Sequence, residues 1–341
     1  MRIFVYEHIT GGGFAGGPLP ASLAREGAAM LRAVAADLAA IAGVSVVTTI
    51  DERVLSSLAQ ELDERIEAVV VRTHAGGGRE HFDRLASTSD GCLIIAPETD
   101  GILLERTQRA RELGARVFGS SATAILLAGD KLELPGHLAA RGIPCVPAAP
   151  YRSGVAPPFP PPWVLKPRAS AGSTDTYLLS DLEERIAVED AILTPRISGL
   201  AASILAIVGE KGILPLAPGA QELSKDGRFR YLGGVVPLPS IEGDRATRLA
   251  LRAIDAVPGL AGFVGVDLIL GRERGPAPVD TVVEINPRLT TSYVGLRALA
   301  RANLAERWLE AMLGRPARPV AWRDGEVRFS ASGEVREGAR A

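Results

Sequence analysis

The first third of the chain alternates short apolar runs with stretches of helical periodicity. Strands are predicted at Ile3–Tyr6, Val44–Thr48, Ala68–Val71, Cys92–Ile95 and Val117–Phe118. Helices are predicted around 31–41, 55–62 and 102–113, where apolar residues recur at steps of three and four, and a polar helical stretch precedes Cys92. Short buried strands separated by helices indicate a parallel, doubly wound sheet.

Ligands of such sheets bind beyond the carboxyl ends of the strands. Three segments are predicted at that edge, namely Gly11–Gly13, Thr73–Gly78 and Pro97–Gly101. His8 and His74 follow predicted strands and are weaker candidates for substrate contact. The glycines at 11–13 lack the spacing of a dinucleotide-binding loop, and we expect a loop over 8–24.

The pattern changes near Gly119. A helix over 120–140 is expected to be interrupted around Gly129 and Pro135, and the proline-rich segment 147–162 cannot form a regular element. Trp163–Lys166 is predicted to be a strand that leads into the small-residue loop Ala169–Ser173. From 204 onward the strands have antiparallel character, and a helix over 297–313 follows the last of them.

Composition narrows the chemistry that the chain can perform. Its 38 basic and 40 acidic residues give a formal net charge of -2, which argues against an extended nucleic-acid surface. Two isolated Cys and four scattered His lack the spacing of a disulfide framework or a zinc site. No run approaches the roughly 20 apolar residues that a spanning helix needs, so we expect a soluble cytoplasmic protein. Carboxylates, Lys, Arg and backbone amides remain as the chemical tools.

Two predicted strands near the end of the chain carry three oxygen ligands. Glu284 and Asn286 are two apart in Thr281–Asn286, so their side chains leave the same face. If Gly265–Leu270 pairs antiparallel with this strand, Asp267 lies across from Glu284. Facing like charges are destabilising, and Mg²⁺, which favours a few carboxylates plus substrate phosphates, would bridge them. Solvated edge charges with a turn Asn are the competing interpretation.

Several cationic residues could serve a phosphate. Lys166 lies in an apolar strand, where burial is costly without an anionic partner. The small residues of Ala169–Ser173 would let backbone amides approach phosphate oxygens, although the P-loop pattern is absent. Arg288 follows the presumed metal ligands and could hold a transferring phosphoryl group or an anionic intermediate. For Lys131 a place on a helix surface is the simpler interpretation when it is taken alone.

Together these segments resemble the ATP-grasp family. Its motifs occur in the family's order as Asp130-Lys131-Leu132, Val164-Leu165-Lys166-Pro167, Gly265-Val266-Asp267 and Glu284-Ile285-Asn286-Pro287-Arg288. The resemblance implies that Lys131 and Lys166 contact ATP phosphates and that Arg288 and Lys166 are catalytic. It further implies that Asp267, Glu284 and Asn286 bind Mg²⁺, with Mn²⁺ as the alternative cation. The loop implied to cover the phosphates consists of Ala169, Ser170, Ala171, Gly172 and Ser173.

The resemblance also implies a division into domains. Residues 1–118 correspond to an N-terminal Rossmann-like domain, 119–190 to an ATP-grasp lid and 191–332 to a mixed or antiparallel C-terminal part, with a flexible tail over 333–341. One departure concerns the hinge before Ile197. Where the family usually places a pair of Gln or Glu residues, this chain has Thr194-Pro195-Arg196, so backbone groups are expected to contact adenine.

A narrower resemblance concerns the tyramine–glutamate ligase group of this family. It rests on Ile95–Gly101, Tyr231-x-Gly233-Gly234 and Asn286–Tyr293. It implies a γ-glutamyl amide formed from L-glutamate and tyramine or tyrosine through an acyl phosphate, with release of ADP and phosphate, in the biosynthesis of a methanofuran- or methylofuran-type cofactor. The expected partners are these small molecules and, as an open alternative, a second copy in a homodimer. Candidate substrate-pocket residues are Glu98, Asp100, Ser292 and Tyr293.

Three other functions stay open at this point. A different ATP-grasp ligase would join other amino acids or amines. A non-catalytic module would bind ATP as a regulator, although such a module needs neither all three oxygen ligands nor Arg288. A kinase acting on a small alcohol would release a stable phosphorylated product instead of free phosphate.

Overall fold

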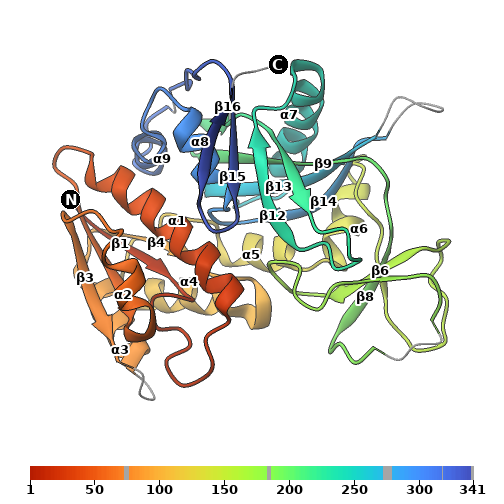
Figure 1. Ribbon diagram of the computed structural model, residues 1–341, viewed down its shortest axis with the longest axis horizontal. Coiled ribbons are helices and arrows are strands. Elements are labelled where there is room, and N and C mark those ends of the chain that lie inside the picture. The colour runs from red at the N-terminus through yellow and green to blue at the C-terminus, as the bar shows by residue number, and fades with distance from the viewer. Residues whose placement is uncertain (73–76, 183–185, 272–278, 317, 339–341) are drawn as a thin grey trace.

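The computed structural model describes residues 1–72, 77–182, 186–271, 279–316 and 318–338. Residues 73–76, which include His74 and most of the predicted edge segment Thr73–Gly78, lie outside the described residues, as does the end of the tail, 339–341. The chain forms an N-terminal parallel sheet, a small antiparallel sheet and a large antiparallel sheet. In Figure 1 the parallel sheet lies at the lower left, the small antiparallel sheet at the lower right, and the large antiparallel sheet above and between them. The mixed α/β architecture expected from the sequence is confirmed.

The N-terminal sheet is parallel, with the strand order β3-β2-β1-β4. Its strands are β1 (Arg2–Glu7), β2 (Ser45–Asp51), β3 (Ile66–Val71) and β4 (Gly91–Ile95). Its helices are α1 (Ala21–Ala39), α2 (Leu55–Leu58), α3 (Gly77–Thr88) and α4 (Ile102–Glu112), with 3₁₀ turns η1 (Glu52–Val54) and η2 (Thr99–Gly101). The predicted fifth strand is reduced to one parallel bridge between Cys92 and Val117.

Both faces of this sheet are covered, as its continuous apolar strands require. Ile3 and Val5 of β1 pack in one cluster with residues of α1, whereas Phe4 and Tyr6 pack in another with Phe82 of α3 and residues of α4. Successive side chains of a strand point to opposite faces, so the strand is buried on both sides. α1 begins at Ala21, inside the predicted loop over 8–24, because Ala21, Leu23 and Ala24 in its first turn have high helix propensity.

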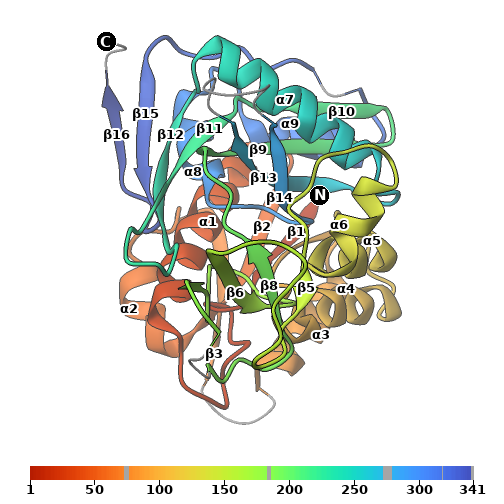
Figure 2. The same cartoon turned by 90° about the vertical axis from the view of Figure 1, so that its right-hand side faces the viewer.

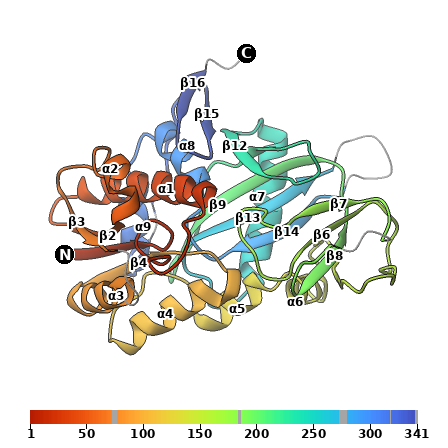
Figure 3. The same cartoon turned by 60° about the horizontal axis from the view of Figure 1, so that its bottom comes forward.

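Two antiparallel sheets make up the rest of the chain (Figures 2 and 3). The small sheet, in the order β5-β8-β6-β7, consists of β5 (Ala149–Pro150), β6 (Trp163–Pro167), β7 (Tyr177–Leu179) and β8 (Ala191–Pro195). The large sheet runs β14-β13-β9-β11-β12-β15-β16, with β10 paired to β9. Its strands are β9 (Leu200–Gly209), β10 (Gly212–Pro215), β11 (Gly219–Leu223), β12 (Tyr231–Val236), β13 (Gly262–Leu270), β14 (Thr281–Asn286), β15 (Glu326–Ser330) and β16 (Val335–Gly338). The accompanying helices are α5 (Ala122–Gly129), α6 (Glu133–Ala139), α7 (Ser240–Asp255), α8 (Ser292–Leu299) and α9 (Leu304–Met312).

The helix predicted over 120–140 is interrupted after Gly129, as expected, but it is not broken at Pro135. The Asp130 carboxylate accepts hydrogen bonds from the backbone N–H groups of Leu132 and Glu133 at 3.0 and 3.1 Å, which caps α6. Pro135 lies in the first turn of α6, where its missing N–H breaks no helical hydrogen bond. The break therefore places the loop around Lys131 between two helices.

Other boundaries also differ from the prediction. The helix expected over 297–313 is two helices, because Asn303 starts α9 by accepting a hydrogen bond from the Glu306 N–H at 3.0 Å. The tail expected to fray from Gly333 instead pairs as β16 with β15. The small sheet is completed by β8, beyond the predicted lid boundary at residue 190. None of the helices in the described ranges is long and apolar enough to cross a membrane.

His8 follows β1 and is packed inside the N-terminal part of the chain. It is 4% exposed, its Nδ1 lies 3.0 Å from the Tyr6 hydroxyl, and a Cβ added at Gly13 would lie 2.3 Å from its ring. Burial, together with Arg106, lowers the pKa of His8 from 6.5 to about 3. The folded protein therefore holds a neutral imidazole that the unfolded chain can protonate.

This difference predicts a pH-dependent stability. The unfolded chain binds the proton of His8 more readily than the folded protein does. The contribution of neutral His8 to the free energy of unfolding is therefore fully present above pH 6.5 and falls as the pH drops towards about 3. We expect a loss of about 2 kcal/mol in the free energy of unfolding by about pH 5. Urea unfolding of the wild type and of His8→Gln across this pH range measures this loss. The free energy of unfolding of the variant should depend less steeply on pH, because the variant lacks the titrating imidazole. Equal slopes would contradict the assignment.

Candidate active site

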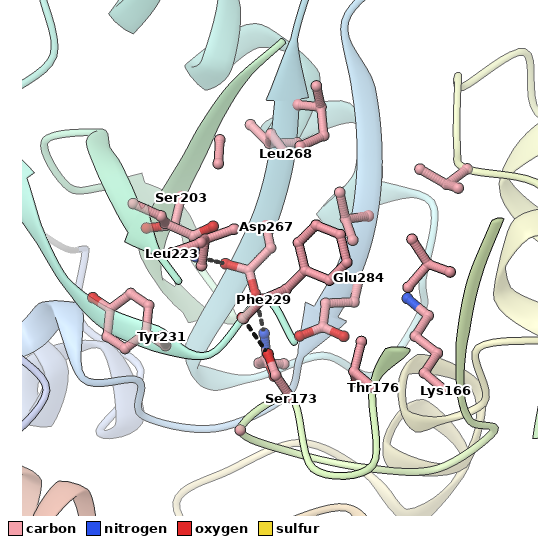
Figure 4. Close-up of a pocket in the computed structure, with 18 of the residues that line it drawn as sticks. Lys166, Ser173, Thr176, Ser203, Leu223, Phe229, Tyr231, Asp267, Leu268 and Glu284 are labelled. Carbon is pink, nitrogen blue, oxygen red and sulfur yellow. Dashed lines mark hydrogen bonds between the residues drawn. The ribbon is translucent and has the colours of Figure 1, made fainter. Parts of the chain in front are cut away.

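One cavity lies between the small sheet, the large sheet and α1. It is lined by β6 and the loop after it, by strands β9 and β11–β14, and by the segment after β14. Figure 4 shows Asp267 and Glu284 side by side above the loop that carries Ser173 and Thr176, with Lys166 and Tyr231 on opposite sides. Predicted residues that line this cavity are Lys131, Lys166, Ser170, Gly172, Ser173, Asp267, Glu284, Asn286, Arg288 and Ser292.

The two carboxylates face one another across adjacent strands. β13 and β14 are antiparallel, and Asp267 is opposite Glu284, as the sequence predicted. Asp267 accepts hydrogen bonds from Gln221 Nε2 at 2.8 Å and from Asn286 Nδ2 at 3.1 Å. Burial and the neighbouring charge of Glu284 raise the pKa of Asp267 well above its usual value. Burial would also raise the pKa of Glu284, but Lys131 and Lys166 outweigh it and lower that pKa to about 2.

The chemistry of this pair fits a divalent cation. No cluster of three or more His, Cys, Asp or Glu side chains able to hold a metal occurs in the described part of the chain. Two carboxylates that face one another repel each other when both are ionised, and a divalent cation removes this repulsion. Mg²⁺ is commonly held by one or two such carboxylates when substrate phosphates supply further oxygens. Asn286 Oδ1, the third predicted ligand atom, accepts a hydrogen bond from Arg288 Nη2 at 3.3 Å.

Lys131, in the loop between α5 and α6, and Lys166 of β6 lie near the carboxylates. Lys131 Nζ donates to the Ser170 carbonyl at 2.7 Å and lies 3.5 Å from Glu284 Oε2. Arg168 holds the turn before it, donating to Asp130 at 2.8 and 2.6 Å. Burial lowers the pKa of Lys166, against the attraction of Glu284. The lysine carried by the loop between α5 and α6 is therefore a cavity residue, not a helix-surface one.

The small-residue loop after β6 contacts both neighbouring parts of the protein. Ser173 Oγ donates to the Phe229 carbonyl at 2.8 Å, which joins the loop to the β11–β12 connection. Gly172 has φ +67°, and a Cβ there would lie 2.9 Å from Leu23 Cδ2 of α1. Ala169 is exposed and Ala171 half-buried, and neither lines the cavity. The loop therefore closes one end of the cavity through three of its five predicted residues.

Arg288 is held by a residue from the N-terminal sheet domain. Its Nε and Nη2 donate to the two Glu98 carboxylate oxygens at 3.0 and 2.9 Å, and the side chains are 12% and 5% exposed. Charge attraction from Glu98 raises the pKa of Arg288 despite burial. Glu98, predicted as a substrate contact, instead orients this guanidinium toward the cavity.

Two other predicted substrate contacts lie away from the cavity. Asp100 is exposed and has φ 54° within η2. Tyr293 is completely buried, and its hydroxyl donates to Asp37 of α1 at 2.6 Å. Successive helical residues point about 100° apart, so Ser292 lines the cavity while its neighbour packs into the core.

Sequence reasoning missed several lining residues. Ser203 lies on β9, which pairs with β13, and Gln221 lies on β11, which pairs with β9. Glu26 comes from α1. The alternation of β11 could have placed Gln221 on the cavity side. Tyr231 is part of the motif Tyr231-x-Gly233-Gly234, but the sequence did not predict a role for its side chain in the site. The hinge residues that differ from the family pattern, Thr194, Pro195 and Arg196, also line the cavity.

Comparison with known proteins decides the family. Residues 128–292 match the ATP-grasp domain, and residues 44–125 match the pre ATP-grasp 3 domain. The chain belongs to the ATP-grasp family. The second match contains β2–β4 and α2–α4, and every residue that lines the cavity except Glu26 lies within the matched ATP-grasp residues.

Two curated ligases and one solved structure are similar to this chain over different lengths. The chain is 31% identical over 209 residues to a tyramine–L-glutamate ligase of Methanocaldococcus jannaschii, covering 61% of this chain and 58% of that protein. The ligase of the same name from Methanocaldococcus fervens is 29% identical over 208 residues, with 61% and 62% covered. The match thus spans about three fifths of these curated relatives. The crystal structure of a putative ATP-grasp superfamily protein from Archaeoglobus fulgidus superposes with a TM-score of 0.70 at 25% identity, covering 96% of this chain and 92% of that one.

Proposed function

We propose that the chain is an ATP-dependent carboxylate–amine ligase that forms a γ-glutamyl amide from L-glutamate and tyramine or tyrosine. The observation that carries this proposal is the convergence of two facing carboxylates with Lys131, Lys166 and Arg288 on one cavity. Anionic phosphates and a carboxylate would find complementary charges there. The similarity to two tyramine–L-glutamate ligases supports the choice of substrates.

A carboxylate is a poor electrophile, so the reaction requires activation. In the proposed reaction the γ-carboxylate of glutamate attacks the γ-phosphoryl group of ATP, which forms an acyl phosphate and ADP. The amine nitrogen then attacks the acyl carbon and displaces phosphate. Lys131 and Lys166 would neutralise phosphate oxygens, and Arg288, fixed by Glu98, would hold the carboxylate or the acyl phosphate.

The same cavity would hold the metal and keep out water. Asp267 and Glu284, with Asn286, would hold Mg²⁺, which when bound supplies charge neutralisation to the phosphates. Closure of the loop through Ser170, Gly172 and Ser173 would shield the acyl phosphate from hydrolysis. By the same similarity, the amide would serve as an intermediate of a methanofuran- or methylofuran-type cofactor.

A product assay tests this function. The purified protein is incubated with ATP, Mg²⁺, L-glutamate and a panel of amines and amino acids, and ADP, phosphate and amide are quantified. We expect tyramine or tyrosine to give equal amounts of γ-glutamyl amide, ADP and phosphate. If both are inert while another amine reacts, the substrate assignment is wrong but the ligase class stands.

Two other functions would give different products. A kinase would convert ATP into ADP and a phosphorylated alcohol without free phosphate. A regulatory module would bind ATP without turnover with any amine. The retention of Glu284, Asp267 and Arg288 in one cavity favours the ligase over the regulator, since nucleotide binding alone does not require all three.

A further inference from the structure

A carboxylate from the N-terminal domain reaches the same cavity and is used by none of the steps above. Glu26 lies on α1 and lines the cavity together with Tyr231 and Arg288. It is half-buried, and within the described residues its carboxylate has no hydrogen bond or ion pair. A half-buried carboxylate with no hydrogen-bonding partner is available to bind a ligand in the cavity.

The geometry of α1 places Glu26 beside the loop that closes the cavity. Leu23 and Glu26 are three residues apart on the helix and therefore share a face. Leu23 approaches Gly172 of the loop, which the proposed function assigns to the ATP phosphates. Glu26 thus stands one helical turn from the predicted phosphate end of the cavity, where the acyl phosphate would form.

The negative charge of Glu26 favours an ammonium group over a phosphate or a carboxylate. The other charged groups at the phosphate end are the cations Lys131, Lys166 and Arg288 and the paired carboxylates of β13 and β14. An additional carboxylate repels ATP and the γ-carboxylate of glutamate, and it attracts a cation. L-Glutamate and the acceptor both carry an ammonium group at neutral pH, but only the ammonium of the acceptor must lose a proton before its nitrogen can react.

We propose that Glu26 binds the ammonium group of the acceptor amine and accepts a proton from it. This inference rests on the proposed ligase function. The nitrogen, now uncharged, uses its lone pair to form the C–N bond with the acyl carbon. The C–O bond to phosphate breaks, phosphate leaves with that electron pair, and the second nitrogen proton leaves with the phosphate.

The surroundings of Glu26 suit proton transfer. Burial raises its pKa to about 7, against the attraction of Arg288 and Arg25. Two further titratable groups of the described chain lie near it: Tyr231, which also lines the cavity, and Glu7, whose carboxylate lies against Gly27. A base with a pKa near the working pH accepts a proton and releases it again efficiently.

Kinetics of Glu26→Gln test the proposal, with tyramine and tyrosine as acceptors. We expect KM for the reactive acceptor to rise by about tenfold or more, while KM for ATP and glutamate stays near the wild-type value. Glu26→Asp, which keeps the charge, should recover part of the loss. Glu64→Gln, an exposed Glu of the same domain, is the matched control and should behave as the wild type.

Hydroxylamine separates this inference from the ligase function. It is uncharged at neutral pH and traps acyl phosphates without needing an ammonium site. Glu26→Gln should therefore form glutamyl hydroxamate at the wild-type rate, and the acid limb near pH 7 in the wild-type profile for the amine should vanish. Equal losses of hydroxamate and amide, or an unchanged KM for the amine, would overturn the role of Glu26. If the wild type forms neither product, the ligase function itself fails.

Discussion

Glu284→Gln should lower the rate of amine-dependent ADP release by about 10²–10³-fold at saturating substrates. Glu284 lies opposite Asp267 and 3.5 Å from Lys131 Nζ, and its low pKa keeps it ionised at every working pH. The amide has nearly the same shape but no charge, so it binds a divalent cation beside Asp267 more weakly and does not offset the charges of Lys131 and Lys166. Steady-state kinetics with a phosphate-release assay measures this loss.

A control on another strand of the same sheet isolates the effect of the lost charge. Glu222→Gln changes an exposed residue of β11 that pairs with Arg328 at 2.9 Å on the surface, and turnover should stay at the wild-type level. Circular dichroism should show that both variants keep the fold. Near-normal ligase turnover in Glu284→Gln would remove Glu284 from the metal site.

Arg288→Gln should destabilise the protein and also disable the reaction. It leaves the Glu98 carboxylate, 5% exposed, without its bidentate partner. Removing one member of a buried ion pair costs about 3–5 kcal/mol, and the loss of the guanidinium from the cavity should cost about 10²–10³-fold in turnover. Thermal or urea unfolding gives the first quantity, and phosphate release at a temperature where the variant is folded gives the second.

The double variant Glu98→Gln/Arg288→Gln separates stability from catalysis. Since it leaves no buried charge unpaired, much of the lost stability should return. Turnover should stay low, because the cavity still lacks the guanidinium. Recovery of turnover together with stability would mean that Arg288 acts only through the fold, and the proposed role in holding the carboxylate or acyl phosphate would be withdrawn.

The sequence predicted features that depend on local periodicity. The pairing of Asp267 with Glu284 followed from two strands near each other in the chain and from the two-residue period of a strand, and the structure has this register. The parallel sheet followed from alternating apolar runs and helices in the same way. In both cases the deciding interactions lie within short stretches of the sequence.

Features that depend on distant partners could not be read from the sequence. Glu98 and Arg288 are 190 residues apart, so no local pattern indicated that the carboxylate would hold the arginine instead of a substrate. Tyr293 adjoins a cavity residue in sequence, but its partner Asp37 is 256 residues away on α1. Glu26 was missed because the start of α1 lacks the bulky apolar periodicity that identifies a helix.

Transfer of oxygen from the carboxylate to phosphate tests the central claim most directly. L-Glutamate labelled with ¹⁸O in its γ-carboxylate is incubated with the protein, ATP, Mg²⁺ and the amine, and the released phosphate is analysed by mass spectrometry. If the carboxylate is activated as an acyl phosphate, each phosphate released with amide carries one ¹⁸O atom from glutamate. Unlabelled phosphate formed alongside the amide would contradict the proposed phosphoryl transfer to the γ-carboxylate.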